Sequence, residues 1–454
     1  GVWLTVRTGF VQVRHLGKAL KFMVKNEDNG EGEVTSFGAL CTALSATIGT
    51  GNIVGVATAI CLGGPGALLW MLLAAFFGMA TKYSEGFLAI KYREKKDDSH
   101  YLGGPFYYIE KGMGSKWKWL AKLFAVFGIC VGLFGIGTFT QINGIATAVQ
   151  DFFDPESAHV AFTLLGNDYT WATVIGGLVV TLCVALVVLG GIQRIAKVSE
   201  VIVPFMAITY VLFALIIVLG HITAIPAAVK LICQSAFDPQ AALGAATGVT
   251  IKLAMQKGIG RGIFSNEAGL GSAPIAAAAA KTKDTVRQGL VTMTGTFIDT
   301  IVICTLTGLS IVVTGAQNAF VAGSVEGVKI TSRAWQTGLP WNGRFSAFVL
   351  MVCLAFFAFT TILGWNYYSE RCLEYLVGSQ KFTKVYRYVY ILAVFIGPYL
   401  TVAAVWNIAD ICNGLMAFPN LVALFALSGV VGKETRAYFA EKRHDLKAMA
   451  QDKK

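Results

Sequence analysis

Two interrupted apolar segments carry the residues whose types and spacing could do chemistry. The longer one reads MQKGIGRGIFSNEAGLG from residue 255 and places three glycines within five residues. Glycine loses the most conformational freedom when a helix holds it, so this run predicts a helix break at about 258–264. Within a bilayer, the N–H and C=O groups that a break releases must find partners in protein or in a watery cavity. Broken membrane helices of this kind build the binding sites of many secondary transporters.

The shorter segment, ATIGTGNIVG at 46–55, predicts a second break at about 48–51. Amide groups at Thr50 and Gly51 would begin a new helical half there, and a helix N-terminus offers N–H donors to a carboxylate. Carbonyls that end the preceding half would be free to coordinate a hard cation, which prefers oxygen ligands. A single Gly-x-Gly usually marks close helix packing. Two breaks at matching positions favour a binding site instead.

Other apolar segments supply polar and aromatic side chains for such a site. The hydroxyls of Thr360 and Thr361 either bond back to their own helix or complete the shell of a cation. Trp365 is either a packing residue or a wall of the site, and we favour the wall. Gln141 either bonds a neighbouring helix, which is the commoner case, or contacts the ligand.

Ionisable residues within apolar segments are functional candidates by default. Arg261, Glu267 and Asp299 are such residues, and Glu370 and Asp410 lie nearer to segment ends. Arg261 and Glu267 are six residues apart across the predicted break, so they could form an internal ion pair.

The composition defines the class of protein that must position these residues. Hydrophobic residues make up 55% of the 454 residues and charged residues 14%, against about 25% charged in soluble proteins. We therefore expect an integral membrane protein. Its net charge of +11 does not indicate nucleic-acid binding, because almost all basic residues flank apolar segments on one side. The nine cysteines lie nearly all in apolar runs, which is typical of core residues rather than disulfides.

Catalytic and metal-binding clusters cannot be assembled from this sequence at membrane depth. The five histidines all fall in loops or at segment ends. We expect neither an enzyme nor a cofactor, and the only metal that we expect is a coupling sodium ion.

Ten apolar segments are long enough to span a hydrocarbon core, which needs about 20 residues. Of the 37 Lys and Arg residues, 29 fall on one side of these segments and four on the other. By the positive-inside rule, both ends of the ten-helix unit are expected in the cytoplasm. Residues 7–25 alternate basic and apolar side chains and predict an amphipathic helix on the membrane surface. The expected limits of the ten segments are 37–62, 66–90, 119–150, 171–190, 199–224, 241–280, 287–314, 345–376, 385–407 and 409–431.

The number of segments predicts an internal symmetry. The first segment enters from the inside and the sixth from the outside, so two five-helix repeats would be inverted relative to one another. We expect these repeats at 37–225 and 226–431, after a cytoplasmic segment at 1–36 and before a basic tail at 432–454. The two broken segments then hold corresponding places in an all-α membrane bundle and are expected to face one another at mid-membrane.

Several motifs resemble the alanine/glycine:cation symporter family. They are GTGNI from Gly49, GGPGA from Gly63, GMATKY from Gly78, GGPFYY from Gly103 and the highly specific SNEAGLGS from Ser265. The resemblance covers about residues 7–430. It implies a LeuT-like fold of five plus five inverted helices, and sodium- or proton-driven uptake of alanine or glycine across the cell membrane. Members usually carry one more N-terminal helix, of which residues 1–6 are expected to be the end.

The resemblance also implies positions for the ligands, which we combine with the reasoning from the residues. Asn52 falls where the wider fold can place a second cation. The candidate substrate residues are Thr50, Gly51, Gln141, Gly260, Phe264, Ser265, Asn266 and Trp365. The candidate sodium residues are Ser45 and Ile48 through their carbonyls, Thr360 and Thr361 through their hydroxyls, and Asn52.

Three functional classes compete for this sequence. A secondary transporter explains the paired breaks and the inverted halves. A channel has no need for a pair of broken helices, and a membrane enzyme needs a catalytic cluster at depth. We therefore expect a symporter of a small neutral amino acid, since Phe264 and Trp365 would restrict the pocket. The alternatives are a proton-coupled transporter of another small amino acid or, less favoured, a channel.

Overall fold

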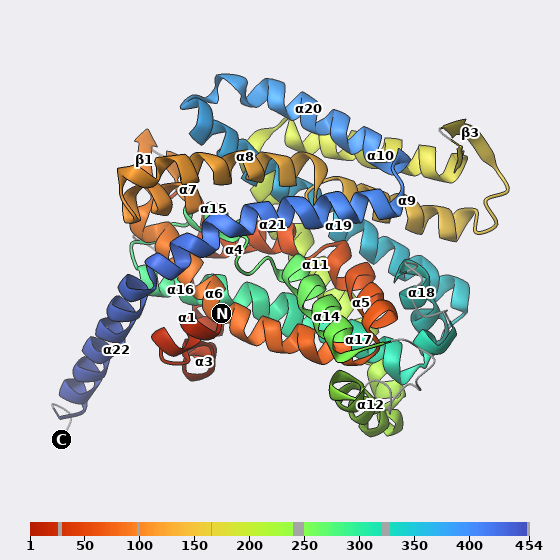
Figure 1. Cartoon of the computed structure of the whole chain (residues 1–454), viewed down its shortest axis with the longest axis horizontal. Coiled ribbons are helices and arrows are strands. Elements are labelled where there is room, and N and C mark those ends of the chain that lie inside the picture. The colour runs from red at the N-terminus through yellow and green to blue at the C-terminus, as the bar shows by residue number, and fades with distance from the viewer. Residues whose placement is uncertain (26–29, 98–99, 165, 239–248, 320–326, 452–454) are drawn as a thin grey trace.

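Long helices running side by side form the body of the molecule, with a short antiparallel hairpin at each end (Figure 1). The structure is a computed structural model that describes residues 1–25, 30–97, 100–164, 166–238, 249–319 and 327–451. In Figure 1, β1 (Glu94–Asp97) and α22 (Ser428–Gln451) lie at the left end, and β3 (Val160–Leu164) lies at the right end.

Elements of the first half include the expected helix 1 in two pieces, α4 and α5. The predicted surface helix at 7–25 is instead two short helices that meet at His15. The elements are α1 (Val2–Arg7), α2 (Val11–Arg14), α3 (Leu16–Val24), α4 (Ser36–Thr47), η1 (Gly51–Gly55), α5 (Val56–Gly63), α6 (Gly66–Tyr92), β2 (His100–Leu102), α7 (Pro105–Tyr107), η2 (Tyr108–Gly112), η3 (Ser115–Trp117), α8 (Lys118–Phe134), α9 (Phe139–Phe153), β4 (Asn167–Thr170), α10 (Trp171–Val188), α11 (Gly191–Gly220), η4 (Ile222–Ala224) and α12 (Ile225–Phe237).

Elements of the second half again include a broken helix, α14 and α15. Residues 241–248 of the predicted sixth segment lie outside the described residues. The remaining elements are α14 (Ile251–Asn266), α15 (Ala273–Ala277), α16 (Thr285–Thr296), η6 (Phe297–Cys304), α17 (Thr305–Val313), η7 (Ala316–Ala319), α18 (Gly327–Gly338), α19 (Gly343–Val377), η8 (Gln380–Phe382), α20 (Thr383–Ile396), η9 (Gly397–Tyr399) and α21 (Val402–Ala426).

Eight of the ten expected segments correspond to helices long and apolar enough to cross a membrane. The sixth, which lies partly outside the described residues, and the ninth, whose helix α20 has 14 residues, do not. Within the described residues, seven helices are long and apolar enough to span, and the bent pair of α4 with the η1–α5 helix makes an eighth. The predicted limits at 407 and 409 are wrong. Helix α20 ends at Ile396, because Gly397-Pro398 cannot continue it, and α21 begins six residues later under a cap from the Thr401 side chain.

The predicted third segment, 119–150, also differs from a single helix. It is divided into α8 and α9 by four residues, 135–138. The hydroxyl of Thr138 donates to the Leu133 carbonyl at 2.6 Å, which satisfies one acceptor that the break frees. A Cβ at Gly137 would lie 2.7 Å from the Trp365 Cβ, so glycine here lets α19 approach the backbone.

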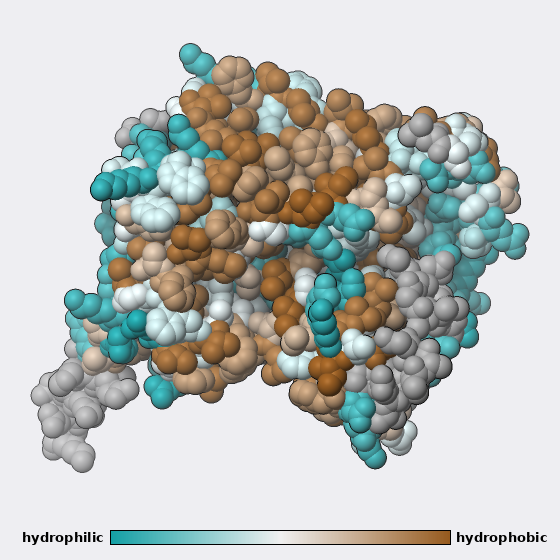
Figure 2. Space-filling view, viewed as in Figure 1, coloured by the Kyte–Doolittle hydropathy of each residue, from teal (hydrophilic) through white to brown (hydrophobic). Residues whose placement is uncertain are grey.

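Apolar side chains cover much of the outer surface. Figure 2 shows them over the middle of the view, with hydrophilic residues gathered mostly toward the left and right ends. Large apolar residues exposed on α10 and α11 include Leu186 and Val201, at 69% and 70%. Exposed apolar area of this extent on long helices is the surface that lipid tails contact.

Candidate substrate and cation site

The first helix breaks where the sequence predicts it. Helix α4 ends at Thr47, η1 begins at Gly51, and the two parts are bent by 52°. Side chains satisfy the freed backbone donors: Asn52 Oδ1 accepts from the Gly49 N–H at 2.8 Å, and Gln141 Oε1 accepts from the Thr50 N–H at 3.0 Å. The predicted break at 48–51 is confirmed.

The second break is not at 258–264, and that prediction is wrong. Helix α14 runs without interruption through all three glycines to Asn266, and the chain unwinds at 267–272 before α15. Gly258 and Gly262 serve close packing against α6, because a Cβ at Gly258 would lie 2.1 Å from the Ala67 carbonyl oxygen and one at Gly262 would lie 3.1 Å from the Met71 side chain. Unwinding uses positive φ angles at Glu267, Gly269 and Gly271, of 56°, 95° and 83°.

The two broken helices meet at Gly51. A Cβ there would lie 3.0 Å from Ser265 Cα and 3.2 Å from a ring carbon of Phe264, so the backbone of η1 rests directly against the end of α14. The helices therefore face one another, as expected. Gly260 does not belong to this contact: it is exposed, and no atom lies within 4 Å of a Cβ built on it. Its predicted role in the substrate site is a misassignment that follows from the misplaced break.

A cavity of about 400 Å³ reaches the first break. It extends from Thr50 and Val54 along α9 to Asp151, and Trp406 of α21 forms part of its wall. This volume lies within the ~300–1,000 Å³ of small-molecule sites. The buried hydroxyl of Thr50 has no hydrogen-bond partner within the described part of the chain. A buried hydroxyl of this kind is ready to bind a polar ligand group.

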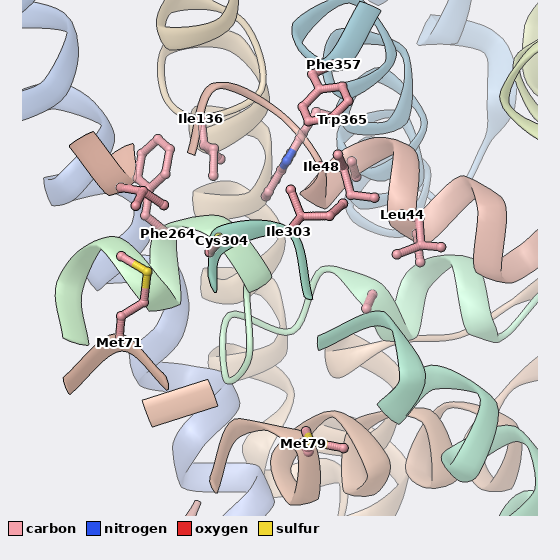
Figure 3. Close-up of a cluster of buried hydrophobic side chains, with 14 of the residues drawn as sticks. Leu44, Ile48, Met71, Met79, Ile136, Phe264, Ile303, Cys304, Phe357 and Trp365 are labelled. Atoms are coloured by element: carbon pink, nitrogen blue, oxygen red, sulfur yellow. The ribbon is translucent and has the colours of Figure 1, made fainter. Parts of the chain in front are cut away.

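Aromatic residues close the site near α14 without lining this cavity. Phe264 is buried and its ring lies 4.8 Å from that of Trp406. Trp365 is fully buried, and its Nε1 donates to Glu267 at 2.7 Å, so it tethers the unwound segment. Figure 3 draws Phe264, Trp365 and Ile48 as parts of one buried cluster.

The predicted cation residues separate into two groups. The Thr361 hydroxyl lies 3.2 Å from the Ile48 carbonyl and 3.0 Å from the Phe357 carbonyl, where α4 meets α19. The Thr360 hydroxyl lies within 3.1 Å of two carbonyls of its own helix and 3.4 Å from the sulfur of Met206 on α11. The Ser45 hydroxyl donates to Thr42. The structure thus brings Thr361 to the broken end of α4 and turns Thr360 toward α11.

A buried carboxylate joins three helices beside the site. Asp299 of η6 accepts hydrogen bonds from Asn52 Nδ2 at 2.7 Å, from the Ser265 hydroxyl at 2.9 Å and from the Thr300 hydroxyl at 2.6 Å. Asn266 Nδ2 donates to Thr300 at 3.0 Å. The sequence marks Asp299 as a lone acid in an apolar segment, but Asn52 and Ser265 lie too far along the chain to be assigned from it as partners.

The unwound segment 267–272 is held by acidic side chains. Besides Trp365, Glu267 accepts from the Ser272 hydroxyl. Glu85 of α6 accepts from the Gly269 N–H at 3.1 Å and from Asn420 Nδ2 at 2.7 Å. The ion pair of Arg261 with Glu267 that the sequence suggested is not formed. Arg261 instead pairs with both oxygens of Asp410 at 3.0 Å, because the unbroken α14 points its side chain toward α21.

At the opposite end of the broken helices, backbone hydrogen bonds join the segment before α4 to the segment after α15. The Glu33 N–H donates to the Ala279 carbonyl, and the Lys281 N–H donates to the Val34 carbonyl, both at 2.8 Å. Arg93 donates to four carbonyls of the same strands at 2.6–2.8 Å, those of Glu31, Ala278, Ala280 and Thr282. We refer to the paired segments 31–34 and 278–282, with Arg93, as the inner closure, where inner denotes the side that the positive-inside rule predicts to face the cytoplasm.

A charged cluster supports the inner closure. His100 lies between Glu33, 3.2 Å from Nδ1, and Glu374, 2.9 Å from Nε2. Hydrogen bonds to Glu33 and then to Glu374 raise the pKa of His100 to about 9, against its burial and the nearby Arg371. Arg371 in turn pairs with Glu374 at 2.7 Å.

Comparisons with known proteins agree with this architecture. The chain is 54% identical to an uncharacterized transporter of Haemophilus influenzae over 97% of this chain and 91% of that protein. It is 45% identical to the sodium/alanine symporter AgcS of Methanococcus maripaludis over 98% and 94%. The crystal structure of MhsT in complex with L-phenylalanine superposes with a TM-score of 0.59 at 12% identity, covering 90% of this chain and 99% of that one. The predicted LeuT-like fold is thereby confirmed.

A family model, the sodium:alanine symporter family, matches residues 1–453. With a mostly helical membrane architecture and relatives that match over nearly their full length, a transporter rather than an enzyme is shown. The chain is a multi-pass membrane protein that belongs to the sodium:alanine symporter family, and its activity is cation-coupled amino-acid symport.

Proposed function

We propose that the protein carries a small neutral amino acid, alanine or glycine, into the cell together with sodium by alternating access. The observation that carries this proposal is that Thr50 lines the 400 Å³ cavity and lies on the same helix break as Ile48, whose carbonyl the Thr361 hydroxyl reaches from α19. The substrate named for the relative in Methanococcus maripaludis, alanine, supports it. The inverted repeats at 37–225 and 226–431, and cytoplasmic ends, belong to the same proposal.

The substrate carboxylate would bind at the start of η1. Its acceptors would be met by the N–H of Thr50, which now donates to Gln141, and by the unpartnered Thr50 hydroxyl. Gln141 Oε1 thus marks the position of one carboxylate oxygen, and the helix N-terminus adds favourable charge. Gly51 lets this backbone lie against Ser265.

The ammonium group would face the end of α14. The Ser265 oxygen and the Asp299 carboxylate behind it provide negative potential there, while Phe264 and Trp406 limit the space for a side chain. A steric clash rejects a larger substrate more strongly than lost contact rejects a smaller one. Glycine should therefore bind better than leucine.

Sodium would bind where α4 and α19 meet. The hydroxyl of Thr361 lies within hydrogen-bond distance of the carbonyls of Ile48 and Phe357. The Ser45 carbonyl would add a further ligand, and Thr360 would contribute less because its hydroxyl lies toward α11. These are all oxygen ligands, as a hard cation requires. A second cation at Asn52 would have to share its side-chain oxygen with the Gly49 N–H.

Uptake of labelled alanine into proteoliposomes, with and without an inward sodium gradient, tests the proposal. Uptake should require sodium, and excess leucine should compete poorly. Alaninamide, which lacks the carboxylate, should also compete poorly. Equal competition by alaninamide would reject the site at Thr50, and equal competition by leucine would reject the small pocket.

Proton coupling is the second candidate, favoured by the fully buried carboxylates of Asp299 and Glu267 beside the site. A buried acid can carry the coupling proton in a transporter. In the same vesicles, uptake driven by a pH gradient in the absence of sodium would establish this alternative, and its failure would leave sodium.

A further inference from the structure

A second cavity, separate from the substrate site, lies at the β1–β2 end of the molecule. Its volume is about 580 Å³, and it is bounded by the hairpin, by η2, by the first turns of α8 and by the end of α19. Basic side chains dominate its wall. They are Lys96, Lys111, Lys118 and Lys122, together with His100.

Ion pairs within the wall leave positive charge unbalanced. Glu94 is shared by Lys96 at 3.2 Å and Lys111 at 3.4 Å, and Glu110 pairs with Lys118 at 2.8 Å. Lys122 makes no ion pair with any residue that the structure describes. His100, whose pKa lies at about 9, adds a further positive charge at neutral pH. Even with Glu374 in the wall, positive side chains outnumber carboxylates by two.

Two exposed tryptophans place this cavity at the membrane surface. Trp117 and Trp119 are 37% and 59% exposed, and their rings stack with centroids 6.3 Å apart. They flank Lys118 at the point where the apolar span 115–153 begins. Exposed tryptophan at the end of a span is typical of the headgroup level. Lys118 and Lys122, four residues apart, lie on one face of α8 beside them.

We propose that this cavity binds the phosphate headgroup of an anionic phospholipid. The acyl chains would lie along the exposed apolar face of α8, and the tryptophans would hold the glycerol level. The phosphate would enter between Lys118 and Lys122, since basic pockets between membrane helices on the positively charged side bind anionic headgroups. Figure 2 shows hydrophilic side chains at the left end of the view, where Figure 1 places β1. His100 and Glu374 line this cavity and also belong to the charged cluster that supports the inner closure, so a bound lipid would contact that cluster.

Retention of lipid by purified full-length protein, measured by native mass spectrometry, tests the proposal. The probes are phosphatidylglycerol and phosphatidylcholine of equal chain length, offered in equal amounts. The wild type should retain phosphatidylglycerol preferentially. The double substitution Lys118→Gln with Lys122→Gln should reduce that preference by about 30-fold, since each of the two basic contacts near a membrane surface is worth about 1 kcal/mol.

Lys116→Gln is the matched control, because Lys116 lies in the same basic turn but does not line the cavity. It should retain the wild-type preference. If the double variant is not monodisperse, Lys122→Gln alone serves, since no ion pair is lost. Equal retention of the two lipids by wild type, or equal loss in the Lys116 control, would overturn the proposal. Displacement of the lipid by millimolar inorganic phosphate would assign the cavity to a soluble anion instead.

Discussion

The two ends of the broken helices are held in different ways. On the β3–β4 side, a cavity reaches Thr50, whose hydroxyl is left without a partner among the described residues. On the β1–β2 side, the inner closure joins segments 31–34 and 278–282, and Arg93 donates hydrogen bonds to four of their carbonyls. A cavity thus reaches the site from one end, and hydrogen bonds join the chain segments at the other end, as we expect for one state of the proposed alternating-access cycle.

This difference indicates which hydrogen bonds contribute most to the free-energy difference between the two conformations. A hydrogen bond contributes about 1 kcal/mol net, and moving a two-state equilibrium from 99:1 to 1:99 takes about 5.5 kcal/mol. Together, the two backbone hydrogen bonds and the four Arg93 hydrogen bonds named for the inner closure contribute a free energy of about that size, roughly 6 kcal/mol. In the proposed transport cycle these bonds would have to be offset by several kcal/mol when this end opens, and removing a few of them should shift the equilibrium by a comparable amount.

The largest effect is expected from Gly51→Ala, which would disturb the binding site at Thr50. The new Cβ would lie 3.0 Å from Ser265 Cα, so η1 and α14 must move apart. Misplacement of a binding group by about 1 Å can reduce a rate on the order of 100-fold. Alanine uptake should fall by that factor. The control is Gly55→Ala in the same segment, where the nearest atoms are 4.0 Å away. Equal loss in both variants would contradict the contact argument.

Thr361→Ala should raise the sodium concentration for half-maximal uptake by about tenfold, since a bond to a charged group is worth about 1.5–3 kcal/mol. Thr361→Ser, which keeps the hydroxyl, should restore it. Thr360→Ala sharpens the comparison because that hydroxyl lies against Met206 rather than Ile48. It should change sodium dependence less. Equal effects at both positions would show that the two hydroxyls share the cation.

The sequence supports prediction of the fold better than of the site. Both helix breaks follow from glycine patterns, the Thr361 hydroxyl does reach the Ile48 carbonyl, and Gly51 does lie against Ser265. The second break was nonetheless misplaced, because a glycine in a membrane helix can serve unwinding or close packing. At Gly258 it serves packing against α6, and the sequence alone does not distinguish the two uses.

The sequence also did not predict the polar contacts between residues far apart in the chain. Asn52 and Asp299 are 247 positions apart in the chain, and their hydrogen bond depends on how η1 and η6 pack. The family resemblance implied a second cation at Asn52, yet both polar atoms of its side chain have protein partners. The inner closure escaped notice for a related reason: it is made largely by backbone groups and Arg93, which carry no motif.

Arg93→Gln should weaken the sealed end by removing a guanidinium that reaches four carbonyls, which a shorter neutral amide cannot do. The buried Cys41 of α4 should then react several-fold faster with a membrane-permeant thiol reagent, as followed by peptide mass spectrometry. Lys91→Gln is the control, since its ion pair with Glu434 is exposed. Unchanged Cys41 reactivity in Arg93→Gln would mean that the backbone pairing alone seals this end.

The smallest effect is expected from pH, acting through His100. Its pKa is raised from 6.5 to about 9, so the closed arrangement favours the protonated ring. The resulting stabilisation is complete below pH 6.5 and is lost as pH rises through about 9. The ring faces Glu33, Glu374 and Arg371. Hydrogen exchange at 278–282, corrected for the intrinsic effect of pH, should therefore accelerate from pH 7 to 10. His100→Gln, which does not titrate, should flatten this profile, and an unchanged profile in that variant would assign the pH response to another group.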